Sequence, residues 1–129
     1  MESLNAVVVG VGSMGKNHAR NYFEMDGVEL VGVCDAQKKV ADSVAGRFKC
    51  ESYPDHKKLL KDYDIDIASI VVPTQYHRKV AVDFIKAGVH LLVEKPIAET
   101  VAEGEKIIEA IVEEIATFLR RFAERGYDL

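Results

Sequence analysis

The chain has 129 residues, of which 48% are hydrophobic, and this is enough apolar material to bury one sizeable core in a single domain. Its formal net charge is −4 with acids and bases interspersed, which argues against a nucleic-acid partner or an anionic membrane surface. No run of about 18 apolar residues occurs, so no transmembrane helix is predicted.

The first elements surround a glycine-rich segment. Residues 4–9 (LNAVVV) are short, apolar and β-branched, as in a buried parallel strand. Residues 10–15 read GVGSMG, and a helix over 15–25 is predicted next. A second β-branched run predicts a strand at 28–34, which Asp35 follows, 35 − 15 = 20 residues after the last glycine. This order of strand, turn, helix, strand and acid matches the dinucleotide-binding fingerprint.

Each residue of the fingerprint has a physical task. Gly10 permits the tight turn, Gly12 lets the backbone approach a pyrophosphate, and Gly15 allows the helix to pack closely on the strand. The N–H groups and the dipole at the helix start favour anionic phosphates. Asp35 is expected to accept hydrogen bonds from the adenosine ribose. The predicted cofactor contacts in the turn are Gly10, Gly12, Ser13, Met14 and Gly15.

The rest of the chain continues to alternate strands and helices. Further strands are expected at 50–53, 67–72 and 89–93, and further helices at 37–48, 55–62, 75–87 and 100–125. Right-handed crossovers then give an α/β fold, a Rossmann-type doubly wound parallel sheet of about five strands in the order 3-2-1-4-5. Ligands bind where the strand order reverses, at the carboxyl ends of the first and fourth strands.

Two polar segments follow predicted strands and should rim this crevice. Pro73 and Thr74 allow two interpretations. Either they have a structural role, in which Pro73 ends the strand and Thr74 caps the next helix, or they line a ligand in the crevice. Glu94 and Lys95 come directly after the last predicted strand. Two charges there are costly to desolvate unless they pair with each other or with a ligand.

The histidines have no metal-ligand spacing, so no metal site is predicted. His77, on the first turn of its predicted helix, either points into the crevice or has a solvated or capping role. The other histidines, His18, His56 and His90, are expected to be structural.

The two cysteines and the start of the sequence bear on the compartment. Cys34 and Cys50 have neither metal nor redox spacing and are expected to be free thiols in a reducing cytosol. The first three residues carry no basic, apolar leader. A cytoplasmic protein is therefore expected.

The fingerprint, the segment 72–77 and the sequence Glu94-Lys95-Pro96 together resemble the Gfo/Idh/MocA family of oxidoreductases, which includes glucose–fructose oxidoreductase and inositol dehydrogenase. The resemblance extends from about residue 4 to about residue 110. It implies a Rossmann domain that binds NAD or NADP. It also implies hydride transfer to or from a hydroxyl carbon of a sugar, cyclitol or related compound.

The resemblance also implies roles for single residues. Pro73 and Thr74 would line the dinucleotide, with His77 as a further cofactor-binding candidate, and Glu94 would contact the nicotinamide ribose. Lys95 would be the catalytic candidate, reaching the substrate hydroxyl as a proton-relay or orienting group. Asp35 has no basic residue directly after it and favours NAD, while the lysines at 38 and 39 keep NADP open.

The chain departs from the family in its last part. Family members continue into a sixth strand and a large substrate domain that supplies an acid–base residue. Here residues 100–125 predict one helix, with Gly126 as its C-cap. We therefore expect one dinucleotide-binding domain over 1–129, a non-family helix at about 110–129, and no substrate domain. The regular order of this tail indicates an engineered or truncated domain, and a natural short relative is the alternative.

One face of the last helix carries an apolar stripe about 140° wide. At about 25 residues the helix spans about 37 Å, whereas a six-residue strand covers about 20 Å, so its far half should overhang the sheet. The strand at 89–93 should leave an unpaired apolar edge. Both surfaces predict a homodimer, and the alternative is a monomer in which the stripe folds back on its own sheet. The stripe consists of Ile107, Ile108, Ile111, Val112, Ile115, Phe118, Leu119 and Phe122.

Three functions agree with these residues. The first is an NAD(P)-binding domain without turnover, in which Lys95 is a relic. The second is a dehydrogenase whose site is completed by another chain, and the third is an engineered self-assembling scaffold with a relic crevice. The first is favoured, because the cofactor residues are kept while no substrate domain is recognisable.

Overall fold

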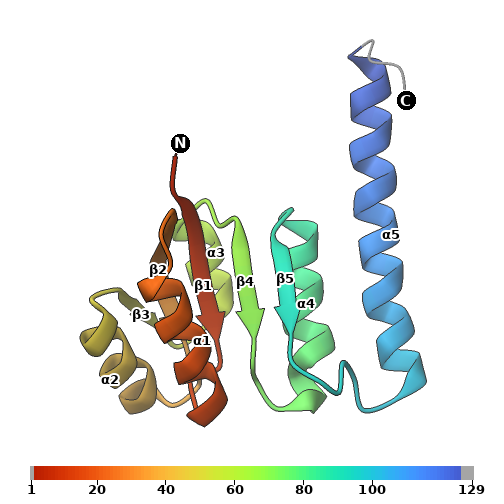
Figure 1. The fold of residues 1–129 in the computed structure, drawn as a ribbon. Coiled ribbons are helices and arrows are strands. Elements are labelled where there is room, and N and C mark those ends of the chain that lie inside the picture. The colour runs from red at the N-terminus through yellow and green to blue at the C-terminus, as the bar shows by residue number, and fades with distance from the viewer. Residues whose placement is uncertain (1, 126–129) are drawn as a thin grey trace.

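A five-stranded parallel sheet forms the centre of the computed structural model, which describes residues 2–125 (Figure 1). The strand order is β3-β2-β1-β4-β5, and each pair of neighbours is parallel, as predicted. From β1 the chain adds β2 and β3 on one side, and it then crosses over to add β4 and β5 on the other side, which gives the doubly wound topology. The strands are β1 (Leu4–Val9), β2 (Val28–Cys34), β3 (Glu51–Tyr53), β4 (Ile67–Ile70) and β5 (His90–Val93).

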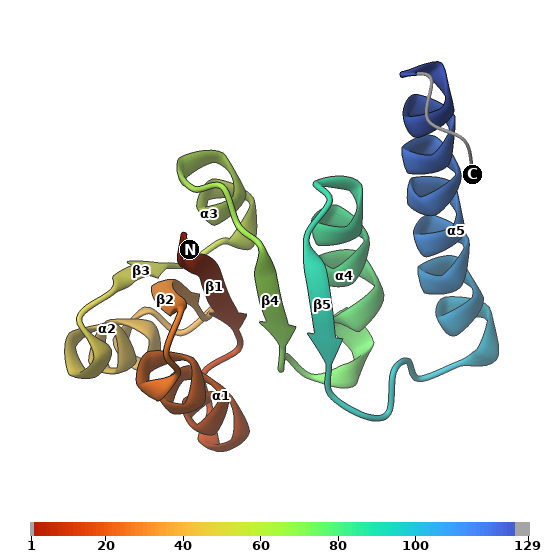
Figure 2. The same cartoon turned by 45° about the horizontal axis from the view of Figure 1, so that its top comes forward.

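Helices cover both faces of the sheet, as the two views show (Figures 1 and 2). Helices α1 and α2 pack on one face, while α3 and α4 pack on the other. Helix α5 lies beside α4, outside the edge strand β5. The helices are α1 (Ser13–Glu24), α2 (Lys38–Phe48), α3 (His56–Asp62), α4 (His77–Lys86) and α5 (Val101–Glu124), with a 3-10 turn η1 (Thr74–Tyr76) before α4.

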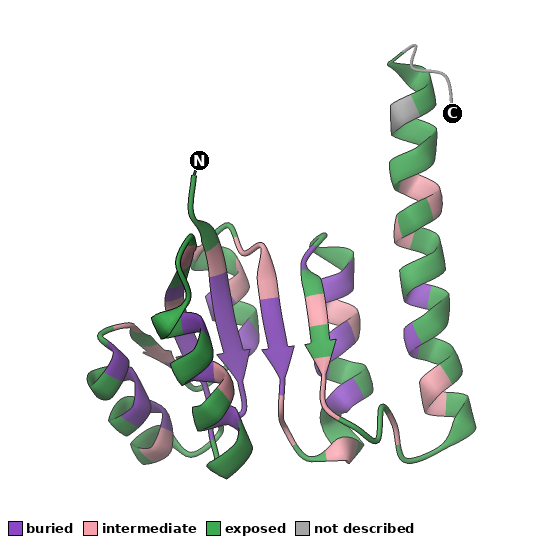
Figure 3. Ribbon diagram, viewed as in Figure 1, coloured by how far each residue is buried: buried purple, intermediate pink, exposed green. Residues whose placement is uncertain are grey.

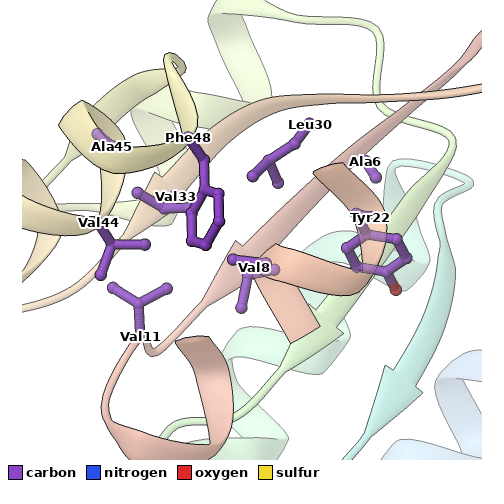
Figure 4. Packing of buried hydrophobic residues seen from close by; sticks show 10 residues of the cluster. Ala6, Val8, Val11, Tyr22, Leu30, Val33, Val44, Ala45 and Phe48 are labelled. Atoms are coloured by element: carbon purple, nitrogen blue, oxygen red, sulfur yellow. The ribbon is translucent and has the colours of Figure 1, made fainter. Parts of the chain in front are cut away.

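Alternate residues of β1 build the two cores. Ala6 and Val8 face α1 and α2, whereas Val7 and Val9 face α3 and α4. Figure 4 shows the first core, where Val8 lies among side chains from β2, α1 and α2. Because this part of the central strand is buried on both sides, residues 6–9 are all apolar. This burial holds the end of β1, and the turn after it, in place.

The boundaries differ from the prediction at β4 and α4. We predicted the strand to residue 72, but β4 ends at Ile70, although the Val71 N–H still donates to the Val9 carbonyl (2.8 Å). The helix predicted at 75–87 begins at His77, because η1 comes first and the Tyr76 N–H donates to the Pro73 carbonyl. The tighter turn lets the chain leave the sheet directly after proline.

Helix α5 outruns the sheet, as predicted, and its upper part is mostly exposed (Figure 3). It contacts α4 through Ile107 and Ala110, at one edge of the apolar stripe. The middle of the stripe points away from α4, so that Ile108, Val112 and Ile115 are each more than half exposed.

A threonine side chain caps the start of α5. Thr100 Oγ1 accepts from the Glu103 N–H (3.1 Å), which is half of a capping box. The side chain of Phe122 and the predicted C-cap Gly126 lie outside the described residues. Within residues 2–125 no helix combines the length and the apolar character needed to cross a bilayer.

Candidate functional site

An open cleft with a volume of about 820 Å³ lies at the carboxyl ends of β1, β2, β4 and β5. This is the crevice where the strand order reverses, and its volume suits a cofactor-sized ligand. Nine of the predicted site residues line it: Gly10, Gly12, Ser13, Met14, Gly15, Asp35, Pro73, Glu94 and Lys95.

Two glycines of the turn are required by the protein's own backbone. Gly10 has a φ of +90°, and a Cβ atom there would lie 2.6 Å from the carbonyl of Val71. A Cβ atom on Gly15 would lie 1.8 Å from the Gly10 carbonyl oxygen. The turn and the close packing of α1 on β1 therefore have the roles predicted for these residues.

Gly12 is different. Its φ is −67°, a value open to any residue, and a Cβ atom there would meet nothing within 4 Å in the described part of the chain. The fold therefore does not need a glycine at this position. The space beside Gly12 belongs to the cleft, and it is the cradle that a pyrophosphate would fill.

The start of α1 faces this cradle. Gly12 is the N-cap of α1, and no side chain among residues 2–125 caps this end. The first hydrogen bond of the helix runs from the Lys16 N–H to the Gly12 carbonyl (3.0 Å). The N–H groups of the first turn and the helix dipole are therefore directed at the cleft, as an anion requires.

Asp35 is held at the end of β2 by two backbone groups. Its Oδ2 accepts from the Val11 N–H (3.0 Å) and its Oδ1 from the Gln37 N–H (2.9 Å). These bonds tie the carboxylate to the glycine-rich turn. Each oxygen keeps a further lone pair that can accept from a hydroxyl group.

The opposite rim is formed by the segment after β5. The Glu94 N–H donates to the Ile70 carbonyl (3.1 Å), which fixes the backbone of Glu94 beside β4. The Glu94 carboxylate contacts His18 Nε2 at 2.8 Å. Lys95 is exposed on the same rim.

Thr74 and His77 were also predicted to bind the cofactor, but they do not line the cleft. Thr74 lines a separate hollow between η1 and the start of α5. The His77 side chain is 1% exposed and lies behind the cleft wall, with Nε2 2.8 Å from the Val72 carbonyl and Nδ1 3.1 Å from the Ile97 carbonyl. Because both nitrogens are occupied by the backbone, His77 holds the two rim segments together and does not present a ring nitrogen to a ligand.

His18, which we expected to be structural, contacts the Glu94 carboxylate at the rim of the cleft. Its ring lies between Ser69 Oγ, 3.0 Å from Nδ1, and Glu94 Oε1, 2.8 Å from Nε2. The available signal was its spacing, since His18 follows Gly15 by three residues and shares a face of α1 with it. Nothing local indicated that Glu94, far along the chain, would meet that face.

The order Ser69–His18–Glu94 is that of a Ser–His–acid nucleophilic site, but the geometry excludes this chemistry. Ser69 is fully buried in β4, and its hydroxyl also contacts the Tyr22 hydroxyl at 2.7 Å. A substrate cannot reach such an oxygen.

Thiolate and metal chemistry are equally unsupported at this cleft. Burial raises the pKa of Cys34 to about 12, with the negative charges of Asp55 and Asp35 adding to the effect. That thiol therefore stays protonated and inert. Within residues 2–125 no cluster of His, Cys, Asp and Glu side chains could hold a metal ion.

Comparison with known proteins agrees with this geometry. Residues 4–120 match the Gfo/Idh/MocA family model, described as an oxidoreductase family with an NAD-binding Rossmann fold. The chain is 33% identical over 111 residues to inositol 2-dehydrogenase of Salmonella typhimurium, which covers 84% of this chain and 33% of that protein. The chain thus spans about a third of the length of this relative.

Two solved structures have the same fold. One is UDP-N-acetylglucosamine 3-dehydrogenase of Acidithiobacillus ferrooxidans, with a TM-score of 0.80 and 35% identity over 88% of this chain and 36% of that one. The other is GenD2 from gentamicin A biosynthesis in complex with NAD, with a TM-score of 0.83 and 29% identity over 88% of this chain and 33% of that one.

Proposed function

Because the chain belongs to the Gfo/Idh/MocA oxidoreductase family and carries its NAD-binding Rossmann fold, we propose that NAD lies in the cleft along the carboxyl ends of β1, β2 and β4. One observation carries this proposal: a Cβ atom at Gly12 would meet no atom of the described residues within 4 Å, and the open space beside it belongs to the cleft. The pyrophosphate then lies on Gly12 and the first turn of α1.

The two ends of NAD meet different acids. The adenosine ribose lies against Asp35, whose carboxylate is already aimed by Val11 and Gln37. The nicotinamide ribose lies towards Glu94, on the opposite rim, with Pro73 lining the wall between them. Bound NAD supplies the hydride acceptor, and Lys95 on the same rim would orient a substrate hydroxyl.

The surroundings of Asp35 favour NAD over NADP. A 2′-phosphate would lie against the carboxylate, and like charges at contact repel. Of the two nearby bases, Lys38 is paired with Asp42 at 2.6 Å. Lys39 is left as the base that could offset a 2′-phosphate.

We propose that residues 1–129 by themselves bind the cofactor without turnover. Lys95 is an exposed rim residue, and exposure does not exclude water or hold a substrate for hydride transfer. This chain covers only about a third of the length of the relative that is an inositol 2-dehydrogenase. A dehydrogenase completed by another chain is the alternative, and substrate-dependent reduction of NAD by the 129-residue chain would establish it.

Self-association is the second proposed property, and the exposed middle of the α5 stripe supports it. Ile108, Val112 and Ile115 are 57%, 58% and 54% exposed. Within the described residues β5 pairs with β4 alone, and Leu92 on β5 is 52% exposed. A twofold homodimer through α5, the β5 edge or both would cover these surfaces. The regular sequence of α5 supports an alternative function, in which the protein is an engineered self-assembling scaffold and its cofactor crevice is a relic.

Calorimetric titration with NAD and with NADP, combined with light scattering, tests these proposals together. We expect one NAD bound per chain, weaker binding of NADP, and the mass of a dimer. The absence of NAD binding would contradict the cofactor proposal, and a monomer mass at high concentration would contradict the dimer.

The free thiols of Cys34 and Cys50 support a reducing, cytoplasmic setting.

A further inference from the structure

A row of hydrogen-bonded side chains runs from α1, past β4, to the segment after β5. Tyr22 OH and Ser69 Oγ lie 2.7 Å apart, Ser69 Oγ and His18 Nδ1 3.0 Å, and His18 Nε2 and Glu94 Oε1 2.8 Å. Ser69 is fully buried and Tyr22 is 8% exposed. This row of side chains therefore begins in the core and ends at the rim of the cleft.

The buried end of this row fixes the His18 ring. The Glu94 carboxylate can only accept, so His18 Nε2 carries the hydrogen that joins them. Ser69 contacts the other ring nitrogen and is itself held by Tyr22. The His18 side chain is 13% exposed, which leaves its ring little room to turn.

Glu94 depends on this ring for its direction. Its backbone is held by the Ile70 carbonyl, but its side chain is 30% exposed, and its carboxylate contacts the His18 ring. A glutamate side chain has several rotatable bonds, and ordering it costs conformational entropy. A fixed imidazole removes most of that cost before a ligand arrives.

We propose that His18 is a positioning residue that aims the Glu94 carboxylate at the nicotinamide ribose of NAD. This proposal rests on the proposed function. It makes α1 serve both halves of the cofactor: the helix start binds the pyrophosphate, and its next turn holds the acid for the distal ribose. Contact with the adenine half does not pass through His18.

Two substitutions of similar polarity separate this role from simple packing. His18→Asn keeps an amide at the height of Nδ1, near Ser69, but is too short to reach Glu94. His18→Gln is longer and carries an amide nitrogen towards Glu94. Calorimetry with NAD and with ADP, which lacks the nicotinamide ribose, gives two dissociation constants for each variant.

We expect His18→Asn to weaken NAD binding about tenfold and to change ADP binding less than about twofold. His18→Gln should stay within about threefold of the unmodified chain for NAD. Equal losses of NAD and ADP affinity in His18→Asn would overturn the proposal, because they would show a general effect on α1. Unchanged NAD binding in His18→Asn would also overturn it.

A third variant keeps the proposal testable should either histidine variant fail to fold. Glu94→Ala removes the group that His18 aims, and it should weaken NAD but not ADP. An unchanged ratio of the two affinities would overturn the inference while leaving NAD binding in place. Failure of the unmodified chain to bind either ligand would instead show that the proposed function is wrong.

Discussion

Gly12→Val separates the needs of the fold from those of the ligand. A Cβ atom at Gly12 meets nothing within 4 Å among the described residues, and φ there is −67°. We therefore expect the free energy of unfolding to fall by only about 1 kcal/mol, the cost of valine in place of glycine at an N-cap. The two added methyl groups enter the cradle proposed for the pyrophosphate.

The affinity change follows from the contacts that are lost. If the unmodified chain binds NAD with a dissociation constant of about 1 mM, binding contributes about 4 kcal/mol. A side chain in the pyrophosphate position removes the N–H contacts of α1 and should abolish measurable binding. Calorimetry at millimolar NAD, with thermal unfolding of the same sample, gives both quantities.

Two controls frame this result. Gly46→Val places the same side chain on α2, where a Cβ atom also meets nothing, and should leave NAD binding unchanged. Gly15→Ala should instead destabilise the fold by about 3 kcal/mol or more, since its Cβ would overlap the Gly10 carbonyl oxygen. A Gly12→Val variant that folds and binds NAD like the unmodified chain would refute the reasoning.

Three further predictions concern turnover, assembly and pH. The 129-residue chain mixed with NAD and a panel of sugars and cyclitols should produce no NADH absorbance, and turnover that Lys95→Ala abolishes would contradict this. Ile108→Glu combined with Ile115→Lys should convert the dimer to a folded monomer with NAD binding intact. The control pair Glu109→Lys with Glu113→Lys changes two exposed side chains of α5 outside the apolar stripe and should leave the dimer. Light scattering measures the mass of each variant, and a dimer unaffected by the first pair would refute an α5 interface. Burial raises the pKa of the Cys34 thiol from 9.0 to about 12 and that of the Cys50 thiol from 9.0 to about 11. The neutral thiols therefore contribute their full stability below about pH 9, and this contribution is lost as the pH rises towards about 12. Urea unfolding at about pH 8 and about pH 10 should show a smaller loss of stability in the Cys34→Ala, Cys50→Ala variant, and an equal loss in both chains would contradict the assignment.

Local signals predicted the part of the molecule around the glycine-rich turn. The strand β1, the turn, α1 and β2 each depend on residues close in sequence, and their order in the sequence identified the crevice. Asp35 was found in the same way, because it follows its strand directly.

The contacts of the histidines could not be predicted in this way. His18 meets a residue 76 positions away, and His77 meets two backbone carbonyl groups whose places depend on the packed sheet. A sequence pattern shows that a side chain is polar, but not which distant group will lie against it.

The face of α5 that packs against α4 could not be predicted from the sequence either. Its length and stripe were predicted from periodicity, but the helix docks on α4 through Ile107 and the small Ala110, at the edge of the stripe. A small residue allows close approach of two helices, so the contact is not at the most apolar face. The exposed stripe that supports self-association follows from this choice of contact.

The most direct measurement is a titration of the ¹⁵N-labelled chain with NAD, followed by amide chemical shifts in NMR. We expect the largest shifts at Val11, Gly12 and Ser13 and beside Asp35 and Glu94, with little change along α5. Shifts confined to the hollow between η1 and α5, or no shifts at saturating NAD, would contradict it.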